Sequence, residues 1–130
     1  MRRRTYLKTI LVVGPLSAAA RAADASHPIH LRVDLSVDPV RKAEMLKNFE
    51  TIFPPAASKQ PGYIDVKMLK LRLTLTGKAP AGVNYRFALT FQSEESRQKW
   101  IASDVHQKVW PAIENTLSTK DYAVMLFDVN

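Results

Sequence analysis

Three stretches of the chain alternate between apolar and polar residues, which is the pattern of a β-strand with one buried face. They cover residues 29–37, 63–73 and 84–92, and a fourth, largely apolar stretch covers residues 122–129. The apolar side of the first holds Ile29, Leu31, Val33, Leu35 and Val37. The side of the third that should face the core holds Tyr85, Phe87, Leu89 and Phe91. These patterns predict four strands.

The strand of residues 63–73 does not keep one phase. Ile64, Val66 and Met68 fall on one side and Tyr63 falls on the other, and the phase changes near Leu69. We therefore expect Ile64 and Tyr63 to point to opposite faces of the sheet.

The first helix is predicted from its start and stop signals. Asp38 is a good N-cap and Pro39 suits the first helical position. One apolar stripe at helical spacing follows: Ala43, Met45, Leu46, Phe49, Ile52 and Phe53. Because proline lacks the N–H that a helix needs, Pro54-Pro55 is expected to end it.

A second helical region begins after Ser93, a predicted cap followed by two glutamates. A single helix from residue 94 to 117 would not keep one apolar face, so we predict a break at Ser103-Asp104 with Asp104 as the new cap. The inner side of the second segment is then Val105, His106, Val109, Trp110, Ile113 and Leu117.

The order of the elements is β-α-β-β-α-β, the ferredoxin-like arrangement. The predicted fold class is α+β, with a four-stranded antiparallel sheet and the helices on one face. The other face is left to water or to a partner. Residues 77–82, Gly-Lys-Ala-Pro-Ala-Gly, form a connection that is long for a hairpin.

The basic character of the chain comes mainly from its first residues. The net charge is +7, but residues 1–25 hold five basic residues and one acidic residue, and the remainder holds 14 basic and 11 acidic residues. A nucleic-acid-binding face requires clustered Lys and Arg, so this composition argues against one.

Residues 1–25 have the layout of a secretory signal peptide, with a basic start, an apolar middle and small residues before a cleavage site after Ala22 or Ala25. The run Arg3-Arg4-Thr5-Tyr6-Leu7-Lys8 is similar to the twin-arginine export motif. We expect export by that route to the periplasm or beyond, and a folded domain over residues 26–130 without a membrane anchor. The alternative is a disordered basic tail.

His106 is the best candidate for acid–base chemistry, because a neutral imidazole on the inner side of a helix start is usable near pH 7. The alternative is a core histidine hydrogen-bonded to backbone. Trp100 and Trp110 could wall an aromatic-substrate pocket, or they could be core or interface residues. Tyr63, Met68 and Phe87 could floor the same pocket.

Metal chemistry is not expected, because the chain has no cysteine and only three scattered histidines. The polar side chains of the strands are expected to pair across the sheet on its solvent or partner side: His30, Arg32, Asp34, Asp65, Lys67 and Arg86. No phosphate-binding loop or nucleophile elbow is present.

Residues 29–129 resemble the antibiotic biosynthesis monooxygenase-like (ABM) domains of the dimeric α/β-barrel superfamily. The residues that carry the resemblance are Pro61-Gly62-Tyr63, the strand Tyr85 to Phe91 with Gln92-Ser93-Glu94-Glu95, Trp100, and Ser103-Asp104-Val105-His106. The resemblance implies a homodimer through the open sheet faces and a pocket between sheet and helices in each monomer.

The resemblance implies three readings of the function. The first is a cofactor-independent monooxygenase of small aromatic or phenolic compounds, with His106 as proton acceptor. The second is a non-catalytic ligand-binding or stress-response barrel. The third is a haem-degrading protein, since Trp100, Ser103 and Asp104 match that group, but Trp110 stands where its haem-ligating histidine would be.

Overall fold

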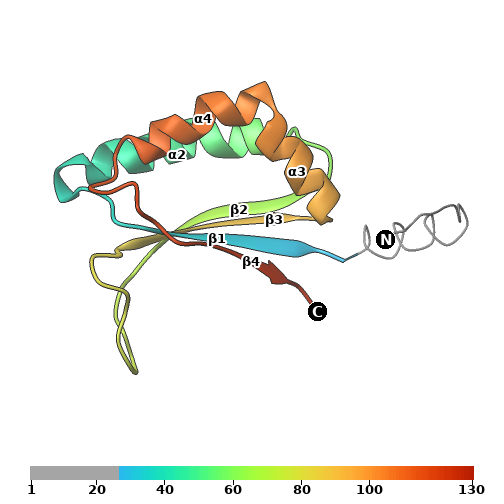
Figure 1. Ribbon diagram of the computed structural model, residues 1–130. Coiled ribbons are helices and arrows are strands. Elements are labelled where there is room, and N and C mark those ends of the chain that lie inside the picture. Colours follow the sequence, from blue (N-terminus) through green and yellow to red (C-terminus); the bar gives the residue numbers. More distant parts are fainter. Residues whose placement is uncertain (1–26) are drawn as a thin grey trace, which may run out of the picture.

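The computed structural model describes residues 27–130, so the expected signal peptide of residues 1–25 lies outside the described residues. Four strands form one antiparallel sheet in the order β2-β3-β1-β4, and all the helices cover one of its faces (Figure 1). The elements are β1 (Ile29–Leu35), the 3₁₀ turn η1 (Pro39–Arg41), α2 (Lys42–Ala57), β2 (Tyr63–Lys70), β3 (Tyr85–Phe91), α3 (Glu94–Ala102), α4 (Asp104–Glu114) and β4 (Val124–Asp128). The predicted ferredoxin-like α+β fold is confirmed.

The two central strands, β1 and β3, carry the core as their alternation predicts. Leu31 pairs with Leu89 and Val33 with Phe87, and all four side chains are buried under the helices. Burial of each such side chain stabilises the fold by about 1.5–3 kcal/mol. This sheet face therefore holds the side chains of a site in fixed positions.

The helix α2 continues through Pro54 and Pro55 to Ala57, and the prediction that these prolines end it is wrong. Phe53 and Ala57, which flank them, are almost fully buried, and the Ser58 N–H donates to the Pro54 carbonyl at 3.0 Å. Packing of the last turn thus offsets the hydrogen bonds that the prolines remove.

The strand β2 changes phase at its beginning and not near Leu69 as predicted. Its register shifts between Tyr63, which pairs with Phe91, and Asp65, which pairs with Thr90. This irregularity turns Tyr63 toward the core and leaves Ile64 45% exposed, so Ile64 does not share the buried side with Val66 as the alternation predicted. The strand also ends at Lys70, three residues earlier than predicted.

The predicted break between the last two helices is confirmed, but its cap is Ser103 and not Asp104. The Ser103 Oγ accepts a hydrogen bond from the His106 N–H at 3.1 Å, and Asp104 is the first helical residue. Val105, expected on the inner side, is 37% exposed, whereas Val109 and Ile113 are buried. No helix among residues 27–130 is long and apolar enough to cross a membrane.

Candidate functional site

A small cavity of about 120 Å³ lies between the helix-covered face of the sheet and the helices. Strands β1, β3 and β4 form its floor, and α2, α3 and α4 form its roof. Its lining residues are Leu31, Val33, Phe53, Phe87, Leu89, Trp100, Ile101, His106, Trp110, Tyr122 and Val124. Apart from His106, Tyr122 and the indole nitrogens, the wall is hydrocarbon.

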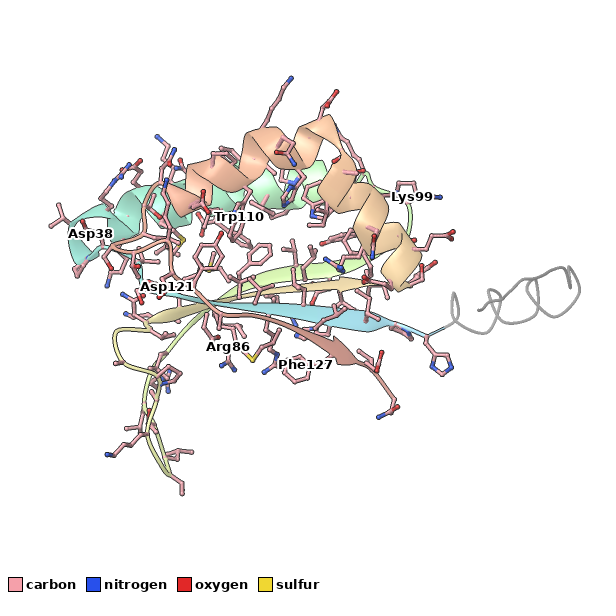
Figure 2. The ribbon with its side chains drawn as sticks, viewed as in Figure 1. Asp38, Arg86, Lys99, Trp110, Asp121 and Phe127 are labelled. Atoms are coloured by element: carbon pink, nitrogen blue, oxygen red, sulfur yellow. The ribbon has the colours of Figure 1, made fainter. Side chains whose placement is uncertain are left out.

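The aromatic part of the wall is held by edge-to-face packing. The ring centroids of Phe53 and Phe87 lie 4.9 Å apart, and those of Phe87 and Trp110 lie 5.4 Å apart. Figure 2 shows Trp110 reaching from α4 toward the sheet, the side on which the cavity lies. Such pairs favour one geometry, so a flat ligand would meet a shaped wall.

His106 enters the cavity from the first turn of α4. The Ser103 cap fixes its backbone, and its ring stands edge-on to that of Trp100 with centroids 5.3 Å apart. Its Nδ1 is buried and has no hydrogen-bond partner among the described residues. Burial lowers the pKa of His106 below its ordinary value of 6.5, so the imidazole is neutral at pH 7 and can accept a proton.

A second polar group in the wall is already occupied. The Trp110 Nε1–H donates to the Tyr122 hydroxyl at 3.0 Å, and that hydroxyl donates to Glu114 Oε2 at 2.6 Å. Burial, followed by the bond to Glu114, raises the pKa of Tyr122. Tyr122 therefore stays a neutral phenol that positions the Trp110 indole, and His106 is left as the unsatisfied polar group of the cavity.

The cavity brings together four of the six predicted site residues, namely Trp100, Trp110, Phe87 and His106. Tyr63 and Met68 do not line it, because β2 is an edge strand and Tyr63 packs on Phe91 instead. Sequence reasoning missed Phe53 and Tyr122. The helical spacing of Phe53 indicates a core position without indicating a site, and nothing local to Tyr122 indicates that its hydroxyl meets Trp110.

The polar set on the other sheet face pairs across strands only in part. Lys67 pairs with Asp65 on its own strand, and Arg32 Nε has no hydrogen-bond partner among residues 27–130. Arg86 Nε donates to Asp34 Oδ1 at 2.6 Å, and His30 Nδ1 lies 2.7 Å from Thr90 Oγ1. Figure 2 shows Arg86 and Phe127 on this helix-free face, opposite Trp110. Ala88 is only 4% exposed there, shielded by its longer neighbours.

The cavity does not fit haem. Trp110 stands at the expected ligand position, an indole does not ligate iron, and its N–H is bonded to Tyr122. About 120 Å³ is also far smaller than a macrocycle requires. Over residues 27–130, no cluster of three or more His, Asp or Glu side chains could hold a metal ion.

A larger hollow of about 320 Å³ lies at the base of the segment that joins β2 and β3. It contains Lys70, Arg72 and Arg86 but no His, Asp or Glu that could act as a base near neutral pH. We therefore place the candidate chemistry at the smaller cavity.

No family model and no curated protein matches the sequence. Solved structures do share its fold. A candidate antibiotic biosynthesis monooxygenase from Caulobacter crescentus CB15 is 17% identical, with a TM-score of 0.63 over 86% of this chain and 98% of that one. The cofactor-independent oxygenase SnoaB from Streptomyces nogalater, solved as a mutant, is 16% identical, with a TM-score of 0.61 over 81% and 94%.

A dimeric ferredoxin-like protein of unknown function from Jannaschia sp. CCS1 is 14% identical, with a TM-score of 0.62 over 79% of this chain and 98% of that one. Others with this fold include a lyase, so the fold does not determine the reaction. Residues 27–130 thus have the ferredoxin-like fold of the ABM-type proteins, as the sequence resemblance predicted.

Proposed function

We propose that this protein is a cofactor-independent oxygenase that binds a one-ring phenol or hydroquinone in the His106 cavity. The observation that carries the proposal is an aromatic-walled apolar cavity whose free polar group is a neutral imidazole. The fold shared with the Caulobacter and Streptomyces proteins is consistent with this chemistry.

The size of the cavity restricts the substrate. An engineered apolar cavity of about 150 Å³ holds benzene, so about 120 Å³ corresponds to a single ring with small substituents. Larger fused-ring compounds would require the wall to move. The hydrocarbon lining favours the ring, and a hydroxyl can pair with His106.

The chemistry needs no external reductant. His106 accepts the proton of a substrate hydroxyl, and the resulting anion gives its electrons to dioxygen. One oxygen atom enters the ring and the other leaves as water, so a hydroquinone and O₂ give a hydroxyquinone and H₂O. The protein supplies orientation, exclusion of water and a proton acceptor.

Oxygen uptake tests the proposal on a panel of one-ring phenols and hydroquinones. We expect His106→Ala to lower kcat/KM by about 100-fold or more, the usual contribution of a positioned base. His27→Ala is the matched control, because His27 is exposed, and it should leave turnover unchanged. If the wild-type protein consumes no oxygen with any compound of the panel, the proposal is wrong.

A ligand-binding role without turnover is the second candidate. It is favoured by the completed Glu114–Tyr122–Trp110 chain, which leaves the cavity with one free polar group and no acid–base pair. Native mass spectrometry that retains a one-ring ligand, together with no consumption of that ligand under oxygen, would support this role over the oxygenase.

We also propose a homodimer through the helix-free sheet face. Phe127 on this face is 46% exposed, and the Arg32 guanidinium lies 5.6 Å from the centre of its ring. A second copy would cover this exposed ring. A wild-type chain that sediments as a monomer at micromolar concentration would refute the dimer.

Residues 1–25 support a further proposal, export by the twin-arginine route. Replacing Arg3 and Arg4 by lysine should retain the uncleaved precursor inside the cell, whereas Arg2→Lys should not. Unchanged processing of the Arg3→Lys/Arg4→Lys variant would refute this route.

A further inference from the structure

The segment between β2 and β3, residues 71–84, forms an arm that leaves the sheet on the side away from the helices (Figure 1). Its first limb continues the strand pattern of β2: Leu69-Lys-Leu-Arg-Leu-Thr-Leu-Thr76 places four leucines on one side. Leu71, Leu73 and Leu75 are 44%, 65% and 88% exposed. The amphipathic pattern of β2 therefore continues past Lys70, where the strand ends, into a segment whose leucines are exposed.

The backbone of this limb also lacks a partner. The ladder between β2 and β3 ends at Lys70 and Tyr85, and the Leu71 N–H makes one more bond, to the Asn84 carbonyl at 2.9 Å. Within the described residues, no backbone hydrogen bond involves residues 72–76. An extended, leucine-bearing segment with free N–H and C=O groups is a surface that another chain can cover.

The far edge of the sheet has complementary properties. β4 is the edge strand next to β1, and its exposed apolar side chains lie on both sides of the sheet. Val124 and Leu126 pair with Val33 and Leu31 on the helix-covered side, and Phe127 pairs with His30 on the helix-free side. The arm, residues 71–84, contains Arg72 and Lys78 and no acidic residue, whereas residues 121–130 contain two aspartates and no basic residue. Apolar character and charge both match the arm to the β4 edge.

One chain cannot bring the two together, because β3 and β1 lie between β2 and β4. A second copy seated on the helix-free face can do so, since the arm descends on that side (Figure 1). Two-fold symmetry would then make the contact twice. We infer that the arm clasps a second copy of this chain, with Leu73 and Leu75 packed on the β4 edge of that copy. The inference rests on the proposed dimer and adds a second contact between the two copies, made by the arm.

Sedimentation velocity over a dilution series tests the clasp. Leu73→Lys/Leu75→Lys should raise the dimer Kd by about 100-fold or more. The two substitutions in each copy remove the apolar contacts of four leucine side chains in the dimer. Thr74→Lys/Thr76→Lys adds the same charge to the other side of the limb and should change the Kd by less than about 10-fold.

Cross-linking tests the contact directly, because the chain has no native cysteine. A mixture of the single variants Leu75→Cys and Phe127→Cys, the latter on the helix-free side of β4, should form a disulfide-linked dimer on oxidation. A mixture of Leu75→Cys with Lys47→Cys, on the exposed side of α2, should not.

The outcomes are distinguishable. A monomeric wild type overturns both the dimer and the clasp. A dimer that is equally tight in the leucine variant retains the sheet-face dimer and overturns the clasp. A wild type that remains monomeric and binds anionic lipid vesicles through Leu73 and Leu75 would assign the arm to a membrane surface, and it too overturns the clasp.

Discussion

His106 illustrates how a single residue acquires its properties from its surroundings. The sequence predicted its inward position from the phase break, and the structure adds that its Nδ1 is buried without a described partner. The environment, and not the residue type, makes it a neutral proton acceptor at pH 7. Part of that environment is the Trp100 ring on α3, which the sequence also marked as a pocket residue, but the burial of the imidazole nitrogen depends on packing that the sequence does not show.

The lowered pKa of His106 predicts a pH-dependent stability. The unfolded chain binds a proton near pH 6.5, but the folded chain binds it only at lower pH, so the free energy of unfolding should fall as the pH drops below about 6.5. The slope can reach about 1.4 kcal/mol per pH unit for one group.

Urea unfolding between about pH 5 and pH 8 measures this slope. His106→Gln should flatten it. His30 also has a lowered pKa, from burial and then Arg32, so the comparison should be repeated in a His30→Gln background. A slope that is unchanged by His106→Gln in both backgrounds would show that His106 is not buried as described.

At Gly62 both the backbone conformation and the surrounding space favour glycine over any other residue. Its φ of 81° is unfavourable for other residues, and a Cβ there would overlap the side chain of Ser96 at the start of α3. Gly62→Ala should lower the free energy of unfolding by about 2–4 kcal/mol, from backbone strain and steric overlap together.

The control for this prediction is Gly77→Ala. Gly77 has a similar φ of 76° but open space around its Cβ position, so it should cost only the strain, about 1 kcal/mol. Equal losses at the two positions, measured by denaturant unfolding, would mean that the contact with Ser96 is unimportant.

At the scale of elements, strand phases and helix breaks were predictable because they depend on local periodicity. The end of α2 was not, because burial of Phe53 and Ala57 overrides the two prolines. The phase of β2 was also missed, since the irregularity at Tyr63 depends on pairing with β3. Predictions from local sequence failed at these two places because packing between distant segments determines the structure there.

The cap between α3 and α4 gives a test at this scale. Ser103→Ala should lower the free energy of unfolding by about 1 kcal/mol and also lower turnover, because Ser103 holds the His106 N–H. Ser93→Ala removes the corresponding cap of α3 and should cost similar stability with little effect on turnover. Equal turnover of the two variants would show that the Ser103 cap does not contribute to positioning His106 for turnover.

For the whole molecule, the sequence predicted the ferredoxin-like fold and a free sheet face, and the structure confirms both (Figure 1). It predicted most of the aromatic cavity wall but not the size of the cavity, which depends on how β1, β3 and three helices pack together. Nor did it assign the leucines of the arm, because their exposure is a property of the assembled sheet. The proposed assembly therefore rests on the structure.

The proposed reaction is tested most directly by oxygen-18 labelling. The protein is incubated with a one-ring hydroquinone under oxygen-18 gas, and the organic product and the water are analysed by mass spectrometry. We expect one labelled atom in the ring product and one in water, with both signals lost in His106→Ala. Label found only in hydrogen peroxide, as in simple oxidation to the quinone, or an unlabelled organic product, would contradict it.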